Sequence, residues 1–156
     1  MPELPEVETV RRGLADLLSG QAVVRATVFD SPKSFPNSPT DVQQFLYGAH
    51  VTTVRRRAKV LMIDLDTRYS LVIHLKMTGQ LIFRGANSFA GGHPNDSLIG
   101  ELPDRSTRVQ IDFTDGSHLF FNDQRKFGWM KLMPTNEIEN LPFMQKVGPE
   151  PLDKKT

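Results

Sequence analysis

The apolar positions near the start of the chain repeat at intervals of three and four. They form one face of a helix and comprise Val7, Val10, Leu14, Leu17 and Leu18. Pro5 suits the first turn of a helix and Gly20 suits its end. Glu3, Glu6 and Glu8 lie where the positive end of the helix favours a carboxylate. The pattern therefore predicts an amphipathic helix from about Pro5 to Gly20.

From residue 22 onward, short runs rich in β-branched and aromatic residues are typical of strands. We expect strands over residues 22–30, 50–57, 59–65, 70–77, 80–84, 108–113 and 117–122, and another after Gly128. Asp115-Gly116 is a strong hairpin signal. In the run 70–77, Met77 would share a face with Leu71 and Ile73, so the pattern alone predicts a core position for it.

The remaining segments have the composition of connections. Residues 31–39 carry three prolines and read as a loop, and residues 85–105 are rich in Gly, Pro, Asn and Ser, which predicts a long mobile loop. Thr40 with Gln43 forms a capping box for a short helix that ends near Gly48.

Two helices and about eight strands in this order predict a mainly β fold with some α. It is a two-layer β-sandwich with the N-terminal helix and the second short helix at its edges. We expect this domain to occupy residues 1–133, followed by a short helix and a linker over residues 134–156.

Composition narrows the class of protein. The 156 residues are 38% hydrophobic and 24% charged, which is typical of a globular domain. No apolar run is long enough to span a membrane, and the acidic start does not resemble a secretion signal, so we expect a cytoplasmic protein. The sequence has no cysteine, which excludes disulfides, a cysteine nucleophile and cysteine-ligated zinc in this chain.

The net charge of +1 means that a nucleic-acid binder of this composition must cluster its basic residues. The densest cluster is Arg55, Arg56, Arg57 and Lys59. Strand alternation would place Arg57 and Lys59 on one face, where they could line a phosphate groove or protect an exposed sheet edge. A second cluster, Arg125 and Lys126 beside Phe127, suits either nucleic-acid binding or a solvated face.

Pro2 is a candidate nucleophile. Removal of Met1 would leave a secondary amine at the chain terminus. A terminal amine titrates near ~8, against ~10.4 for lysine, so far more of it is neutral at physiological pH. Such an amine can attack an aldehyde carbon and form an iminium ion that withdraws electrons, as in lysine Schiff-base catalysis. Glu3 is adjacent and could transfer a proton.

Five segments, in order, resemble the motifs of one family. They are PELPEVET with RRGL at the start, RRAKVL at 56–61, HLKMTGQL at 74–81, NDQRKFG at 122–128 and VGPEPL at 147–152. Together they are similar to the formamidopyrimidine-DNA glycosylase family, which removes oxidised purines from DNA. The resemblance covers the N-terminal catalytic domain.

The resemblance implies a role for several residues. Pro2 would attack the anomeric carbon of the sugar and later eliminate both phosphates, with Glu3 as the acid/base and Glu6 assisting. Lys59 would bind a phosphate beside the lesion. Three further side chains would enter the duplex where the damaged nucleotide has left it, namely Met77, Arg125 and Phe127. Apolar wedges and an arginine suit that role physically.

The resemblance also implies a partner and a missing region. The partner would be double-stranded DNA with an oxidised base or an abasic site, bound by a monomer. The family's helix–two-turn–helix module and zinc finger are absent from this sequence, so we expect no cofactor here. We also expect weak or undetectable activity of this chain alone on duplex DNA.

Three other readings remain open. The related endonuclease VIII group uses the same proline chemistry on oxidised pyrimidines, although Leu4 favours the purine-directed branch. A sandwich could also bind DNA without chemistry, with Pro2 incidental. Proline-terminal tautomerases use the amine as a base, but they are short βαβ units, unlike this strand-rich chain.

Overall fold

The computed structural model describes residues 3–141 and Met144. Its helices are α1 (Leu4–Leu18) and α2 (Pro39–Phe45), with short 3-10 turns η1 (Pro32–Ser34), η2 (Asp96–Leu98) and η3 (Thr135–Asn140). Its strands are β1 (Val23–Val28), β2 (Val51–Arg57), β3 (Val60–Leu65), β4 (Tyr69–His74), β5 (Gly79–Arg84), β6 (Phe89–Gly92), β7 (Thr107–Phe113), β8 (His118–Asp123) and β9 (Trp129–Pro134).

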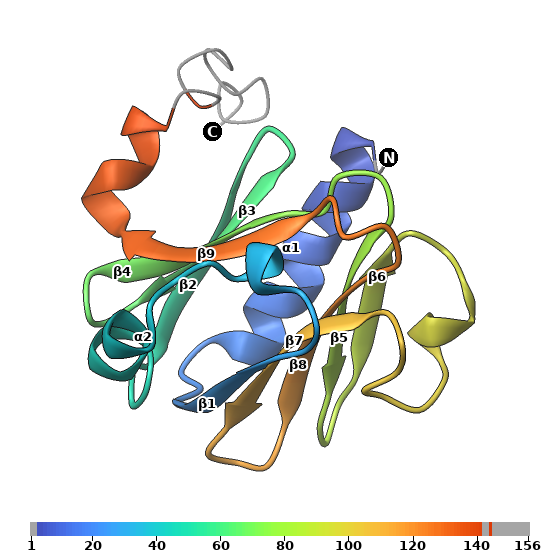
Figure 1. The fold of residues 1–156 in the computed structure, drawn as a ribbon, viewed down its shortest axis with the longest axis horizontal. Helices are drawn as coiled ribbons and strands as arrows, with labels where there is room; N and C mark the ends of the chain where they lie inside the picture. The colour runs from blue at the N-terminus through green and yellow to red at the C-terminus, as the bar shows by residue number, and fades with distance from the viewer. Residues whose placement is uncertain (1–2, 142–143, 145–156) are drawn as a thin grey trace.

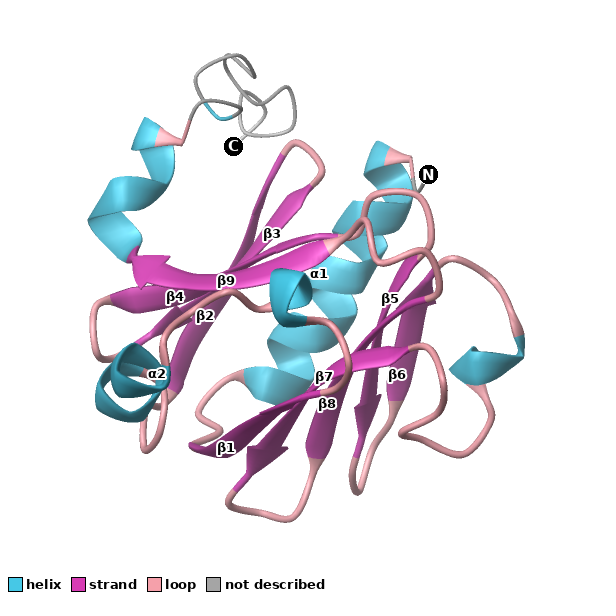
Figure 2. Ribbon diagram, viewed as in Figure 1, coloured by secondary structure: helices cyan, strands magenta, loops and turns pink. Residues whose placement is uncertain are grey.

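The strands form two antiparallel sheets, as the sequence predicts. One sheet has the order β1-β7-β8-β5-β6 and the other β2-β3-β4-β9. The two sheets pack as layers with α1 along one side, against the edge strands β2 and β6 (Figures 1 and 2). The β-sandwich with helices at its edges is confirmed. None of the helices in the described residues is long and apolar enough to cross a membrane.

The main core lies between the sheets and α1. Val7, Val10, Leu14 and Leu18 of α1 are buried there with the inward residues of both sheets. A second apolar cluster covers the outer face of the four-stranded sheet, where Val72 of β4 packs with Ile138 of η3. Strand β4 is therefore buried on both faces, which explains its unbroken apolar run.

The segment 85–105, for which the composition predicts a long mobile loop, contains regular secondary structure. It contains β6, which pairs with β5, and the turn η2. The glycines there allow close packing against α1, since a Cβ on Gly91 would lie 2.6 Å from Val10 Cγ2. The segment adds a ninth strand to the eight expected, because pairing with β5 and packing on α1 override local composition.

Two local predictions were wrong. The short helix is capped by Ser38, whose hydroxyl accepts the N–H of Asp41, with Pro39 at the first helical position. Thr40 is therefore inside the helix, and the capping box does not form. Strand β4 ends at His74, so the alternation of the run 70–77 stops before Met77.

Candidate functional site

Several connections meet at one end of the sandwich. In the four-stranded sheet, Val60 pairs with His74, and His74 pairs with Trp129. The β2–β3 turn, the end of β4 and the start of β9 therefore lie at the same end. The first turn of α1 is also there, near the β4–β5 and β8–β9 loops (Figure 1). This end gathers the described site residues that the sequence singles out.

Glu3 and Lys59 form the part of the site nearest the N-terminus. Pro2 lies outside the described residues. The Glu3 carbonyl accepts the N–H groups of Glu6 and Val7, at 3.0 and 3.1 Å, so Glu3 begins the helix. Lys59 Nζ is 3.7 Å from Glu3 Oε2. The carboxylate is exposed to solvent, as is Glu6, so both can reach a bound molecule.

The β2–β3 turn is held against α1 by a cluster that sequence reasoning missed. Glu8 accepts hydrogen bonds from Arg11 and Arg12 of its own helix and from Arg56 Nε at 2.8 Å. The Arg56 side chain is only 4% exposed, and its Nη1 donates to the Ala58 carbonyl at 3.0 Å.

The same cluster keeps Glu8 ionised. The hydrogen bond from Arg11, reinforced by Arg56 and Arg12 against the opposing effect of burial, lowers the pKa of Glu8 to about 2. The cluster fixes the turn that carries Lys59 relative to the start of the helix. Nothing in the local pattern links Glu8 to Arg56, although both lie within the motifs PELPEVET and RRAKVL.

Arg57 and Lys59 do not share a face, contrary to the strand alternation expected for them. Strand β2 ends at Arg57 and the chain reverses at Ala58, which has a φ of +51°. Arg57 forms an ion pair with Glu139 of η3, whereas Lys59 faces Glu3. The turn therefore divides the basic cluster between η3 and the start of α1.

Met77 and Phe127 are prominent apolar side chains on the two loops at this end. They are 47% and 55% exposed, respectively. The core position expected for Met77 from the pattern is wrong, because it lies in the turn between β4 and β5. The Arg125 guanidinium carbon lies 5.1 Å from the centre of the Phe127 ring, a cation–π geometry. Two apolar side chains and one arginine thus project from adjacent loops.

The two loops are tied together by Asp123, a fully buried carboxylate at the end of β8. Its Oδ1 accepts the hydroxyl of Thr78 from the β4–β5 loop and, at 3.1 Å, the N–H of Arg125. Its Oδ2 accepts the N–H of Gly128 at 2.5 Å. One side chain therefore sets the conformation of the β8–β9 loop and its position relative to the loop that carries Met77.

Lys126 is directed to a different neighbour. It adopts a positive φ of 60°, and its Nζ lies 3.1 Å from the carbonyl oxygen of Asp30 and 3.6 Å from its carboxylate. The contact joins the β8–β9 loop to the segment that follows β1. The ammonium group of Lys126 is thus engaged by Asp30.

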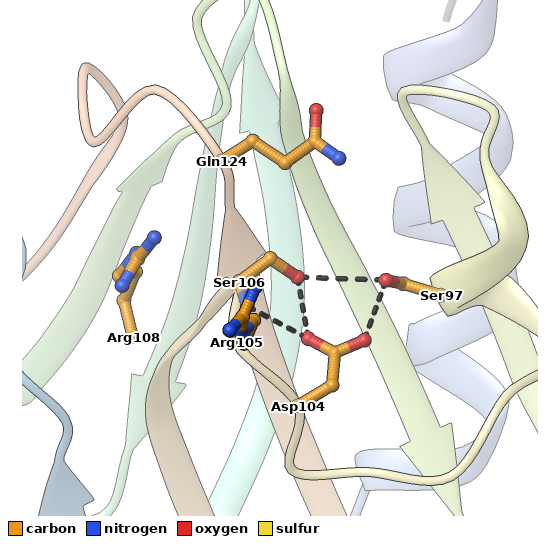
Figure 3. Close-up of a pocket in the computed structure, with 6 residues that line it drawn as sticks. All are labelled: Ser97, Asp104, Arg105, Ser106, Arg108 and Gln124. Carbon is orange, nitrogen blue, oxygen red and sulfur yellow. Dashed lines mark hydrogen bonds between the residues drawn. The ribbon is translucent and has the colours of Figure 1, made fainter.

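An open hollow of about 380 Å³ flanks the β8–β9 loop at Gln124. Figure 3 shows Asp104 between Ser97 and Ser106, both of which donate hydrogen bonds to its carboxylate, with the side chain of Gln124 across the hollow. Arg108 is buried, and its Nε donates to the carbonyl of Asp123 at 2.8 Å. The hollow therefore adjoins the same strand end that anchors the two loops.

His74, at the end of β4, is neutral at physiological pH. Burial, followed by the positive charges of Lys76 and Lys59, lowers its pKa to about 4. Its Nδ1 accepts the N–H of Lys76 at 3.0 Å, which helps to shape the turn that presents Met77.

Comparison with known proteins agrees with this architecture. The family model described as the formamidopyrimidine-DNA glycosylase N-terminal domain matches residues 1–130. The chain belongs to this family. Formamidopyrimidine-DNA glycosylases from Dinoroseobacter shibae and a Jannaschia species are 39% and 42% identical to it, each over 97% of this chain. The chain spans about half the length of these relatives, 52% in both cases.

Solved structures of the family have the same fold. Lactococcus lactis formamidopyrimidine-DNA glycosylase bound to DNA containing an abasic site has a TM-score of 0.77 at 27% identity, covering 96% of this chain and 52% of that one. The same Lactococcus lactis enzyme with DNA containing N7-benzyl-Fapy-dG has a TM-score of 0.73 at 27% identity, covering 93% and 48%.

This glycosylase domain offers no evident metal site in the part that the structure describes. Residues 3–141 and Met144 contain no group of three His, Cys, Asp or Glu side chains that could hold a metal ion. The arrangement is instead one of exposed loop side chains, a lysine–carboxylate pair and buried ionic clusters that hold them. Such a surface can bind an extended anion and insert side chains into it.

Proposed function

We propose that this domain is the catalytic part of a DNA glycosylase/AP lyase that removes oxidised purines from double-stranded DNA. One observation carries the proposal. Met77, Arg125 and Phe127 are exposed on two loops that Asp123 and Thr78 join, at the end of the sandwich where Lys59 faces Glu3. The family membership and the DNA complexes of its relatives support it.

The two loops suit the insertion step. Flipping a nucleotide out of a duplex costs a few kcal/mol of stacking and pairing, which apolar wedges can partly replace. Met77 and Phe127 are such wedges, and Arg125 can donate hydrogen bonds to the base left without a partner. Because buried hydrogen bonds fix the loops beforehand, little conformational entropy is lost on binding.

The chemistry would proceed at the N-terminus. The neutral amine of Pro2 attacks the anomeric carbon of the sugar, the bond to the damaged base breaks, and the proton that the amine gives up balances the charge of the departing base. Glu3 supplies the proton that opens the sugar ring, and the nitrogen lone pair then forms an iminium ion. Loss of a proton from the adjacent carbon expels one phosphate, and a second elimination expels the other. Glu6 would assist, and Lys59 would hold a phosphate beside the lesion.

The decisive experiment is borohydride trapping. The chain, shown by mass to begin at Pro2, is mixed with a duplex that contains an abasic site and is then reduced. A covalent adduct mapped to Pro2 is the expected result. An adduct on a lysine, or no adduct under conditions in which the chain binds the duplex, would contradict the proposed nucleophile. A panel of duplexes with oxidised purines or oxidised pyrimidines then tests the substrate class.

The insertion role has its own test. Met77→Ala and Phe127→Ala should each weaken binding to the abasic duplex, while their exposed positions predict no loss of thermal stability. Asp16→Asn, an exposed change on α1, is a control that should leave binding intact.

The proposal also includes the cellular location of the protein. The relatives named above are bacterial enzymes, which supports a cytoplasmic protein that acts on chromosomal DNA. We expect this chain alone to show weak or undetectable activity on duplex DNA.

A further inference from the structure

The loops that carry Met77 and Phe127 are called the insertion loops below. A second basic surface continues from them along β9. Lys33, Pro36, Trp129, Lys131 and Leu141 line a hollow of about 230 Å³ on the outer side of the four-stranded sheet. Lys33 and Lys131 are exposed. The other three residues provide an apolar floor along which lysine stems can lie while their ammonium groups reach into water. We refer to Lys33, Lys131 and this floor as the β9 basic surface.

The segment that carries Lys33 is held in place. Asn37 pairs with the main chain of Leu132, since its Nδ2 donates to the carbonyl at 2.6 Å and its Oδ1 accepts the N–H at 2.7 Å. Lys126 binds Asp30 at the other end of the segment. Lys33 is therefore presented by a segment fixed beside β9.

The two lysines have no carboxylate partner in the part of the chain that the structure describes. Neither forms an ion pair with a carboxylate of residues 3–141. By contrast, Arg55, Arg57 and Lys126 all have carboxylate partners in the same sheet or nearby loops. Two uncompensated cations beside an apolar floor favour an anionic ligand.

The position of the β9 basic surface points to duplex DNA as the anionic ligand. Trp129 directly follows the loop of Arg125 and Phe127, and its ring lies 6.0 Å from that of His74. A duplex held at the insertion loops extends past them in both directions, with a phosphate at each step along both strands.

We propose that Lys33 and Lys131 bind phosphates of the duplex backbone away from the lesion. This inference rests on the proposed function, because the insertion loops locate the DNA. The contacts are independent of base sequence, since an ammonium group on a flexible stem acts as a point charge. The surface would therefore add affinity for duplex DNA without selecting the lesion.

The salt dependence of binding tests the proposal. Each phosphate contact contributes about 0.9 to the slope of log affinity against log salt concentration. Lys33→Gln and Lys131→Gln should each lower that slope by about 0.9, which is about 3-fold less loss of affinity over a fourfold increase in salt. Arg68→Gln is the matched control, because it removes one exposed charge at the opposite end of the same sheet.

The experiment uses the unchanged chain, the three variants and one duplex with an abasic-site analogue. Smaller slopes for the two lysine variants alone would support the proposal. Equal slopes for all four proteins would overturn it and leave the proposed function standing, as would an equal effect of Arg68→Gln. If the unchanged chain does not bind the duplex even at low salt, the inference about the two lysines fails, whereas the proposed function is judged separately by the trapping experiment.

Discussion

Asp123 should control both the stability of the domain and the order of its insertion loops. The variant Asp123→Asn is nearly the same size, so it introduces no cavity. It replaces one carboxylate oxygen by an amide nitrogen, which donates rather than accepts hydrogen bonds. With the amide nitrogen in the Oδ2 position, the N–H of Gly128 faces another donor and loses its acceptor. With the nitrogen in the Oδ1 position, the N–H of Arg125 keeps only its longer contact with Thr78 Oγ1, at 3.4 Å.

The cost follows from the burial of the site. A buried donor without a partner costs about 1–3 kcal/mol, and the hydrogen bonds that remain no longer involve a charged acceptor. We therefore expect Asp123→Asn to lower the free energy of unfolding by about 2–3 kcal/mol. For a domain of this size, each kcal/mol corresponds to about 2–4 °C, so the midpoint should fall by about 4–12 °C.

Two assays check this prediction. Thermal unfolding followed by circular dichroism gives the stability, with Asp16→Asn as the control for an exposed carboxylate. Amide hydrogen exchange then reports on the loops, where Arg125 and Gly128 should exchange faster in the variant. If Asp123→Asn unfolds at the same temperature as Asp16→Asn, or if neither amide loses protection, the buried carboxylate does not organise the loops.

Three further outcomes are expected. Because the folded-state pKa of Glu8 is depressed from about 4.5 to about 2, its stabilisation is present above pH 4.5 and is lost as the pH falls toward 2. Unfolding measured over this range should therefore show Glu8→Gln less stable at neutral pH and converging with the unchanged chain in acid. The ring protons of His74, followed by NMR, should titrate near pH 4, and a midpoint near 6.5 would contradict the burial argument. Gly79→Ala places a Cβ 2.7 Å from the Cα of Leu75, so it should lower thermal stability by about 1–3 kcal/mol, and an unchanged midpoint would show that the β4–β5 loop yields easily.

The periodic parts of the fold could be predicted from the sequence. The face of α1 from Val7 to Leu18 and the hairpin at Asp115-Gly116 each depend on residues that are close in the chain. Hydrophobic spacing reports such local order directly. The family motifs then identified the loops that carry Met77 and Phe127.

The errors at β6 and Met77 arose where contacts between residues far apart in the sequence decide the structure. Strand β6 forms because β5 offers it a hydrogen-bonding edge and because Gly91 lets Val10 approach, neither of which local composition reveals. For Met77, the pattern could not show that β4 stops at His74. Ser38 and Pro39 form a stronger helix start than Thr40, and that signal was present in the sequence.

The buried ionic clusters could not have been assigned in advance. Glu8 and Arg56 are 48 positions apart, and Thr78 and Asp123 are 45 positions apart. In sequence, Glu8 is simply one more carboxylate in the first turns of a helix. The packing of α1 on β2 brings the first pair within hydrogen-bond distance, and the pairing of β5 with β8, which sets Gly79 opposite Asp123, brings the second.

The connection between β1 and β2 has a consequence for the handling of this domain. The Tyr47 hydroxyl bonds to both the N–H and the carbonyl of Ala26 on edge strand β1, just as Asn37 does for Leu132 on edge strand β9. Two side chains thus occupy main-chain groups that would otherwise pair with a strand of another molecule. Removal of either would open a route to aggregation in concentrated samples, and removal of Asn37 would also loosen the segment that presents Lys33.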